Sequence, residues 1–166
     1  MNISEIESPL QYYFAYGMLT HPEIMEYSMR RHGTAEFAGR ALLRDYKLEM
    51  FHHANIHKQT GSSVHGALWR CDDYALRYLD KVEGVPVYYN RVRVTVDSRR
   101  GSIAVWAYIM TPQIRSDNLV DPTALCTQDY YDNCAHGYSL TGLPINQLNG
   151  AIDEMYSRLD SLDTRS

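Results

Sequence analysis

Glu83 stands at the end of a predicted helix, a position that disfavours a carboxylate. Asp72 predicts the start of this helix, which continues to Val82, and Gly84 predicts its end. A carboxylate in the last turn faces the negative end of the helix dipole, which costs about 0.3–1 kcal/mol. That field, together with any burial, would raise the pKa of Glu83 so that the carboxyl group could take and return a proton near neutral pH. The alternative is a solvated glutamate that tolerates a small penalty.

The stretch FAYGMLTHPE, which begins at Phe14, joins a predicted strand (Gln11–Ala15) to a predicted helix. The N–H groups of Gly17–Leu19 would lack helical partners there, and they would lie at the positive end of the helix dipole. Such a join can hold a carboxylate or an oxyanion, and Gly17 allows the ligand to approach the backbone closely. The alternative is an ordinary turn between a strand and a helix.

Three histidines invite a metal interpretation that their spacing does not support. They lie in FHHANIH, without the HExxH pattern of a helical zinc site, and the following KQTGSS predicts a loop on the surface. Three cysteines are an odd number without a C-x-x-C pair, which favours small packed side chains over disulfides, zinc ligands or nucleophiles. We therefore expect no metal site. These residues are His52, His53 and His57, and Cys71, Cys126 and Cys134.

Hydrophobic periodicity outlines the elements that must position these residues. Alternating valines predict a half-buried strand over Tyr88–Asp97, and Ser98–Gly101 predicts a turn into Ile103–Met110, an apolar strand expected to be central. A capping box at Thr20–Glu23, with Thr20 as N-cap, predicts a helix to about Arg31. A last helix is predicted from Leu148, Ile152, Met155 and Leu159, which share one face. The other predicted elements are two strands between Glu36 and about His53, a strand over Ser63–Arg70, a polar loop after Met110, and a helix from about Thr123 to Tyr138.

The order of these elements limits the fold class. Strict alternation of strands and helices is absent, which disfavours a doubly wound sheet. Many short strands with inserted helices predict an α+β fold, a small mixed β-barrel surrounded by helices. A length of 166 residues suits a single domain over residues 1–166, with a core at about 11–160 and loose ends at 1–10 and 160–166.

Composition excludes several classes of function. The net charge of −4 argues against nucleic acid as the main partner. No apolar run reaches the length of a membrane span, the beginning MNISEIESPLQ lacks the features of a signal peptide, and the few cysteines suit a reducing compartment. We therefore expect a cytoplasmic protein without membrane or nucleic-acid partners. Fourteen tyrosines are unusual and suit either a core or a polar pocket.

Four segments in order carry a family resemblance. They are Phe14-Ala15-Tyr16-Gly17, Val64-His65-Gly66-Ala67-Leu68-Trp69, Leu79-Asp80-Lys81-Val82-Glu83-Gly84 with Tyr89-Asn90-Arg91 and Val92-Arg93-Val94, and finally Tyr130-Tyr131, Gly137 and Gly142-Leu143-Pro144. Together they resemble the γ-glutamyl cyclotransferase family, which includes the AIG2-like proteins and the γ-glutamylamine cyclotransferases. The resemblance covers roughly residues 12–146.

The resemblance implies a fold, a site and a reaction. It implies a small mixed β-barrel with a cavity whose floor is the Tyr16–Leu19 loop, and it implies that Glu83 is the catalytic acid and base. The family reaction cyclises a γ-glutamyl compound to 5-oxoproline by attack of its own α-amine, a lyase-type acyl transfer that needs no cofactor. The implied substrate contacts are the backbone of Gly17, Met18 and Leu19 and the side chains of Tyr16, Tyr89 and Tyr130.

Met18-Leu19 departs from the family pattern, which has Ser-Asn or Thr-Leu at these positions. Because Met18 has no hydroxyl group, backbone contacts would remain while specificity changes. Two other readings stay open: a non-catalytic module that binds a small acid on the same scaffold, and an interaction protein that docks a partner on a tyrosine-rich surface. The oligomeric state also stays open, a homodimer included.

Overall fold

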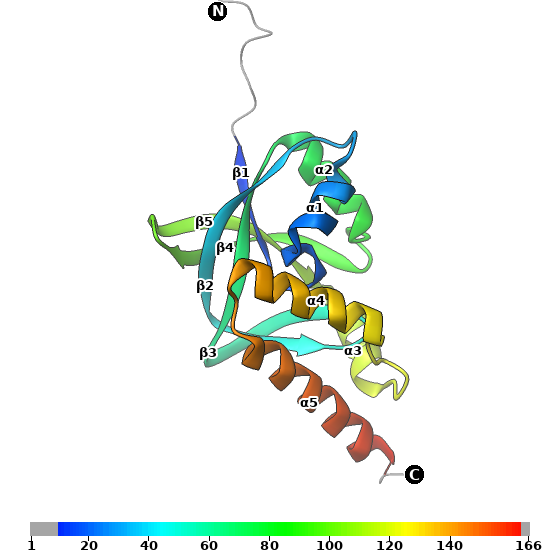
Figure 1. Cartoon of the computed structure of the whole chain (residues 1–166). Coiled ribbons are helices and arrows are strands. Elements are labelled where there is room, and N and C mark those ends of the chain that lie inside the picture. Colours follow the sequence, from blue (N-terminus) through cyan, green and yellow to red (C-terminus); the bar gives the residue numbers. More distant parts are fainter. Residues whose placement is uncertain (1–9, 164–166) are drawn as a thin grey trace, which may run out of the picture.

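Five strands close into a barrel in the order β1-β3-β2-β4-β5, with helices packed on one side (Figure 1). The structure is a computed structural model, and it describes residues 10–163. The strands are β1 (Gln11–Ala15), β2 (Ala35–Met50), β3 (Ala54–Cys71), β4 (Tyr89–Ser98) and β5 (Gly101–Met110). The helices are the 3-10 helix η2 (Met18–Thr20) and the α-helices α1 (Pro22–Met29), α2 (Asp73–Val82), α3 (Pro112–Val120), α4 (Gln128–Thr141) and α5 (Ile145–Asp163).

Pairing between the strands explains how so few of them close a barrel. Neighbouring strands are antiparallel except β1 and β5, which meet in parallel at Tyr13 and Trp106. The β2–β3 ladder is long and is interrupted by register shifts after Phe37 and after Arg44. Such bulges bend a strand and increase its twist, which lets β2 pair with β3 along its length and with β4 near its middle. The predicted α+β barrel is confirmed.

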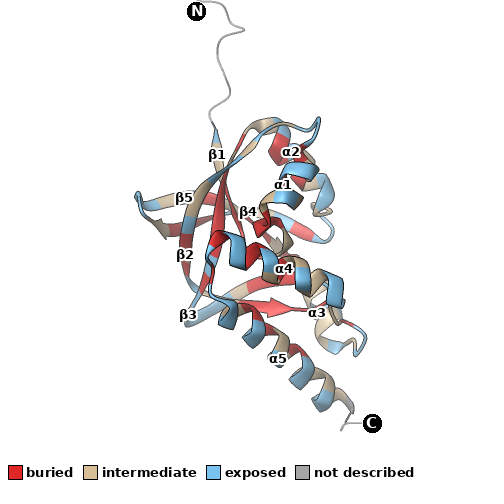
Figure 2. Cartoon of the chain, viewed as in Figure 1, coloured by how far each residue is buried: buried red, intermediate tan, exposed pale blue. Residues whose placement is uncertain are grey.

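Two apolar clusters fill the molecule. One lies inside the barrel and beneath α4 and α5, and it includes Phe14, Val105 and Tyr138. The other packs α1 and α2 against β1, β3 and β5 and includes Met25 and Leu79. Figure 2 shows the consequence, because buried residues line the inner sides of the strands and helices while the outer sides of α4 and α5 are exposed.

Several local predictions are confirmed. The strand Gln11–Ala15 has the predicted bounds, and Asp72 caps α2 by accepting from the Ala75 N–H at 2.8 Å. α2 ends before Gly84, whose φ of 66° lies in the left-handed region. The β4–β5 hairpin turns at the predicted place, and α5 buries Leu148 and Met155 on its inner side.

The long hairpin corrects the prediction of its strands. Glu36 to Met50 belongs to one strand rather than two, and the expected loop KQTGSS lies inside β3. Lys58 pairs with Tyr46 and Ser63 pairs with Arg44, so the polar residues between them form a bulge within a paired strand. The Gly61 N–H donates to the Asp45 carboxylate at 3.0 Å across this bulge. Pairing with β2 therefore overrides the polar composition.

The helices also differ from prediction in places. α3 replaces the polar loop expected after Met110, and α4 begins at Gln128 rather than near Thr123, because Thr127 caps it. The N-cap of α1 is His21, whose Nδ1 accepts from the Glu23 N–H at 3.2 Å.

Thr20 is not part of a capping box, since its hydroxyl donates to the Gly17 carbonyl at 2.6 Å. The predicted frayed end at 160–166 is wrong in its first part, because α5 continues to Asp163. The predicted loose beginning at 1–10, apart from residue 10, and the last residues from 164 lie outside the described residues.

Candidate active site

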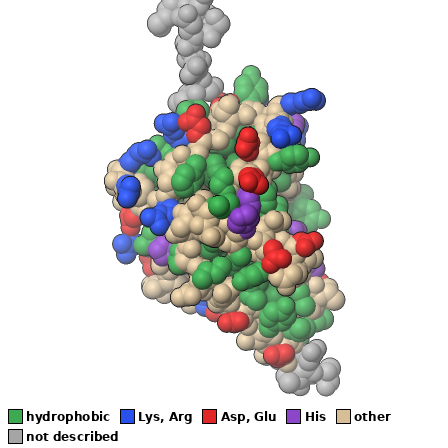
Figure 3. All heavy atoms as spheres, viewed as in Figure 1, with side chains coloured by type: hydrophobic (Ala, Val, Ile, Leu, Met, Phe, Trp, Pro, Cys, Tyr) green, Lys and Arg blue, Asp and Glu red, His purple; other side chains and the backbone are tan. Residues whose placement is uncertain are grey.

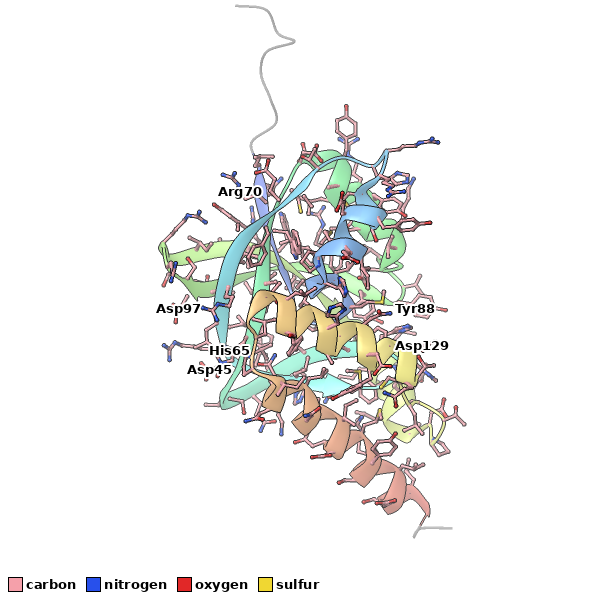
Figure 4. The ribbon with its side chains drawn as sticks, in the orientation of Figure 1. Asp45, His65, Arg70, Tyr88, Asp97 and Asp129 are labelled. Carbon is pink, nitrogen blue, oxygen red and sulfur yellow. The ribbon has the colours of Figure 1, made fainter. Side chains whose placement is uncertain are left out.

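A cavity of about 700 Å³ opens at one end of the barrel, between the strands and the helices. This volume is in the range that encloses a drug-sized ligand. In Figure 4, Tyr88, which lines the cavity, lies on the same side of the molecule as Asp129 in α4, whereas Asp97 and His65 lie away from it. The structure brings together in this cavity every predicted site residue: Tyr16, Gly17, Met18, Leu19, Glu83, Tyr89 and Tyr130.

Glu83 reaches the cavity from the C-terminal end of α2. Its N–H donates to the Leu79 carbonyl at 2.9 Å, which completes the last turn of the helix. Burial raises the pKa of the Glu83 carboxyl from its ordinary value near 4.5 to about 7. The direction agrees with the sequence-based expectation, and burial is its cause. A carboxyl group with this pKa is present in both protonation states near neutral pH.

The raised pKa of Glu83 predicts a pH-dependent cost to stability. Below pH 4.5 the carboxyl is neutral in both the folded and unfolded chain, whereas above pH 7 folding must bury the ionised form. The stabilising contribution present at low pH is therefore lost as the pH rises toward 7. We expect Glu83→Gln to exceed the wild type in stability by about 2–3 kcal/mol near pH 8 and to equal it near pH 4. Urea unfolding at both pH values measures this difference, and a constant difference would contradict it.

The Gly17–Leu19 segment forms the start of η2 and lines the same cavity as Glu83. Its carbonyl groups accept hydrogen bonds, from Thr20 N–H to Gly17 at 3.2 Å and from His21 N–H to Met18 at 3.1 Å. Among the described residues, the hydrogen bonds of this segment do not use the N–H groups of Gly17, Met18 and Leu19. These groups therefore remain available to an anion in the cavity.

Gly17 also leaves little space around itself. A Cβ atom at this position would lie 3.1 Å from the Tyr130 hydroxyl and 3.3 Å from the Ala54 Cβ. Glycine therefore allows the loop, α4 and β3 to meet at the cavity floor.

The predicted tyrosines use their hydroxyl groups to hold the backbone. Tyr89 donates to the Ala54 carbonyl at 2.8 Å, and the Ala54 N–H donates to the Tyr130 hydroxyl at 3.0 Å, so both fix the start of β3. Tyr16 donates to the Tyr108 carbonyl. Burial raises the pKa of Tyr16, Tyr89 and Tyr130 above the ordinary range, so the phenols stay neutral. The hydroxyl groups of Tyr16 and Tyr89 are thus already bonded to the backbone, which leaves mainly their rings to line the cavity.

A hydrogen-bond network around Asp80, three residues before Glu83, fixes the end of α2. Asp80 accepts from Arg91 Nε at 2.8 Å and from the Tyr108 hydroxyl at 2.7 Å, and its backbone carbonyl accepts from the Val85 N–H at 2.9 Å. These bonds tie the turn around Glu83 to β4 and β5.

Other residues of the cavity were not predicted. α3 contributes Ile114, Asp117 and Asn118, whose i, i+3, i+4 spacing places them on one helix face. His52 and His53, expected on a surface loop, are exposed and also line the cavity, and the ring of His53 meets that of Tyr130 edge to face at 5.1 Å. The remaining unpredicted lining residues are Tyr13, Ser28, Ala54, Lys81, Val82, Gly84, Tyr88, Tyr108 and Met110.

The other candidates from the sequence lie outside this chemistry. His57 is in β3, with Nε2 3.6 Å from the Glu49 carboxylate. Cys71 and Cys134 are buried, and burial raises the pKa of each thiol to about 12, which leaves them unreactive. Within residues 10–163 no group of three or more histidine, cysteine, aspartate or glutamate side chains could hold a metal ion.

The fold and the cavity together define a class of protein. It is a small α+β barrel with an aromatic pocket the size of a small molecule, and this pocket holds the Glu83 carboxyl group, whose pKa burial raises to about 7. A family profile described as gamma-glutamyl cyclotransferase, AIG2-like, matches residues 13–132, and the chain belongs to this family. Family and fold support a γ-glutamyl cyclotransferase-like activity.

Solved structures of similar fold agree with this assignment. One named gamma-glutamyl cyclotransferase is 24% identical, with 86% of each chain covered and a TM-score of 0.67. An uncharacterised protein from Homo sapiens is 24% identical, with 87% of each chain covered and a TM-score of 0.65. An AIG2-like protein from Mus musculus is 23% identical over 64% of this chain and 83% of that one, with a TM-score of 0.56. At these identities the likeness shows the fold.

The search of curated proteins found no significant match to the chain. Among the helices of the described residues, none is long and apolar enough to cross a membrane.

Proposed function

We propose that the protein is a γ-glutamyl cyclotransferase that releases 5-oxoproline and a free amine or amino acid from a γ-glutamyl compound. The observation that carries the proposal is the Glu83 carboxyl, with a pKa of about 7, in the same cavity as the Gly17–Leu19 loop. The reaction is intramolecular, so the site must mainly fold the substrate and move protons. Both parts needed for this are present in one cavity.

In this reaction Glu83 accepts protons from the attacking nitrogen and donates them to the leaving nitrogen. The substrate amine is an ammonium ion near neutral pH, and the Glu83 carboxylate takes one of its protons so that the nitrogen can attack the γ-carbonyl carbon. A second proton leaves this nitrogen as the carbon–nitrogen bond forms. The leaving nitrogen receives both protons, one after the other through Glu83, while its bond to the carbon breaks. One of the three original protons stays on the lactam nitrogen, and Glu83 ends ionised as it began.

The Gly17–Leu19 loop supplies the complementary charge stabilisation. Its N–H groups would bind the α-carboxylate of the glutamyl group or the oxyanion that develops on the γ-carbonyl. Met18 can take part through its backbone, although its side chain offers no hydroxyl group. Ring faces of Tyr16, Tyr89 and Tyr130 would enclose the glutamyl chain and exclude water.

A panel of γ-glutamyl compounds tests the proposal. The panel should include γ-glutamyl amino acids, γ-glutamyl derivatives of simple amines, and the matching α-glutamyl isomers as controls. We expect free 5-oxoproline, detected by mass spectrometry, from at least one γ-glutamyl compound and from none of the α-isomers. In an α-isomer the amide carbonyl is bonded to the same carbon as the amine, so attack on it cannot close a five-membered ring and release the leaving amine. Binding of γ-glutamyl compounds without any product would instead identify a small-acid binding module.

A further inference from the structure

α4 braces the segment that leads from the cavity loop into α1. The Tyr138 hydroxyl donates to the Tyr16 carbonyl at 2.7 Å, directly before Gly17. Gly137 lies against the other end of the loop, where a Cβ atom would stand 2.3 Å from the Thr20 hydroxyl oxygen and 2.7 Å from the His21 nitrogen. The position of the loop therefore depends on how α4 seats against it.

Two histidines make the polar contact of this brace. His21 is buried and follows the loop, and His136 is exposed on α4 beside Gly137. The His21 Nε2 lies 3.0 Å from the His136 Nδ1, and the two rings are perpendicular with centroids 4.6 Å apart. This pair is outside the cavity, because neither residue lines it.

The hydrogen bonds around the pair determine the tautomer of each ring. His21 Nδ1 accepts from the Glu23 N–H at 3.2 Å, so it carries no proton. Neutral His21 then has its proton on Nε2 and donates it to His136 Nδ1, which leaves the His136 proton on Nε2. A proton added to His136 Nδ1 would face the Nε2–H of His21, and a proton added to His21 Nδ1 would face the Glu23 N–H. Each protonation therefore breaks a hydrogen bond, and only the neutral pair satisfies all of them.

We propose that His21 and His136 are positioning residues that hold the Gly17–Leu19 loop in its binding conformation when both rings are neutral and release it when either ring takes up a proton. The consequence for substrate rests on the proposed function, since it assumes that the loop binds the glutamyl group. The coupling of the pair to the loop does not.

Acidic side chains accompany the pair on α1 and α4. The side chains of these elements that carry a charge near neutral pH are Glu23 and Glu26 on α1 and Asp129 and Asp132 on α4, all of them acidic, and η2 has none. Figure 3 shows histidine at the surface between α1 and α4, with acidic side chains on both sides. No lysine or arginine occurs in α1, η2 or α4 to repel the added proton.

The proposal is tested by measuring KM and kcat of the wild type and of His136→Asn across a range of pH. The amide oxygen of asparagine can replace Nδ1 as acceptor but does not titrate. We expect KM of the wild type to rise about two- to tenfold between pH 8 and pH 5.5, the equivalent of one lost hydrogen bond, while KM of His136→Asn stays flat. The acid limb of kcat, which Glu83 sets, should be the same in both. His65→Asn, at an exposed histidine of β3 whose backbone rather than side chain bonds to Gln147, should follow the wild type.

NMR tests the pair without any substrate. Imidazole nitrogen shifts should show the Nε2–H tautomer for both rings near pH 8, and the amide signals of Gly17–Leu19 should move as His136 titrates in the wild type but not in His136→Asn. A proton on His21 Nδ1 near pH 8, or amide signals that move equally in both proteins, overturns the proposal. If no substrate turns over, the proposed function fails while these spectra still decide the role of the pair. If the spectra agree but KM responds identically in both proteins, the positioning role is wrong.

Discussion

Glu83→Gln is expected to lower kcat by about two to four orders of magnitude while KM changes only a few-fold. Glutamine keeps the shape and polarity of the side chain but cannot take a proton from the substrate ammonium ion. The fold should tolerate the change well, because a buried amide avoids the cost of burying an ionised carboxylate, the same cost that raises the pKa of Glu83 to about 7. Steady-state release of 5-oxoproline from the best γ-glutamyl compound measures kcat and KM.

The pH profile sharpens this prediction. Wild-type kcat should rise with pH through about 7 as the Glu83 carboxylate forms, and the residual activity of Glu83→Gln should lack that limb. Glu36→Gln is the matched control, since Glu36 pairs with Arg70 at 2.7 Å on the outer surface and should leave kcat unchanged. Equal kcat in the wild type and Glu83→Gln would remove Glu83 from the mechanism.

Glu83 and Gly17–Leu19 could be predicted from sequence because their signals are local. A carboxylate at a helix end and free N–H groups at a strand–helix join follow from neighbouring residues alone. The resemblance to a family supplied the link between these two places, which are far apart in the chain. Their meeting in one cavity depends on barrel closure, and no local pattern determines that.

Other residues that line the cavity could not be predicted from the sequence, because their positions depend on weak periodicity or on strand pairing. α3 presents Ile114, Asp117 and Asn118 at helical spacing, but a face with one apolar residue is too weak a periodic signal to predict a helix. Tyr13 and Tyr108 lie in strands, and which of their neighbours face a cavity depends on pairing between β1 and β5. The N-cap of α1 was misplaced by one residue because the His21 ring accepts the Glu23 N–H in place of the Thr20 hydroxyl.

Arg115→Ala is expected to destabilise the fold by about 2–3 kcal/mol, a loss of roughly 5–10 °C in Tm. Glu49 is 3% exposed and accepts from Arg115 Nε at 2.7 Å and from Nη2 at 3.1 Å. Removing Arg115 leaves a buried carboxylate with the Asn55 amide at 2.7 Å, the His57 ring and the more distant charge of Arg158 as its remaining neighbours. The Arg115 side chain is 34% exposed, so the expected cost lies below that of a fully buried pair. Urea unfolding at pH 7.5 measures it.

The hydrogen bonds of Glu49 with Arg115 and Asn55 also connect the fold to the cavity, so Arg115→Ala should affect substrate binding as well as stability. Asn55 also accepts from the Met110 N–H at 2.8 Å, so Glu49 joins α3 to β2, β3 and β5 directly behind the cavity wall. KM of Arg115→Ala should therefore rise along with its loss of stability, because α3 is no longer held against the pocket.

A double variant separates charge burial from lost packing in this pair. Adding Glu49→Gln to Arg115→Ala removes the unpaired charge and should recover more than half of the lost stability, since a neutral amide costs less to bury than an ionised carboxylate. Arg44→Ala provides the matched surface control: Arg44 and Asp97 also form a close pair at 2.6 Å, but their side chains are 72% and 45% exposed. That substitution should cost far less stability than Arg115→Ala, because solvent screens the exposed pair. Equal losses for Arg115→Ala and Arg44→Ala, or additive losses in the double variant, would show that Glu49 does not anchor α3 through its charge.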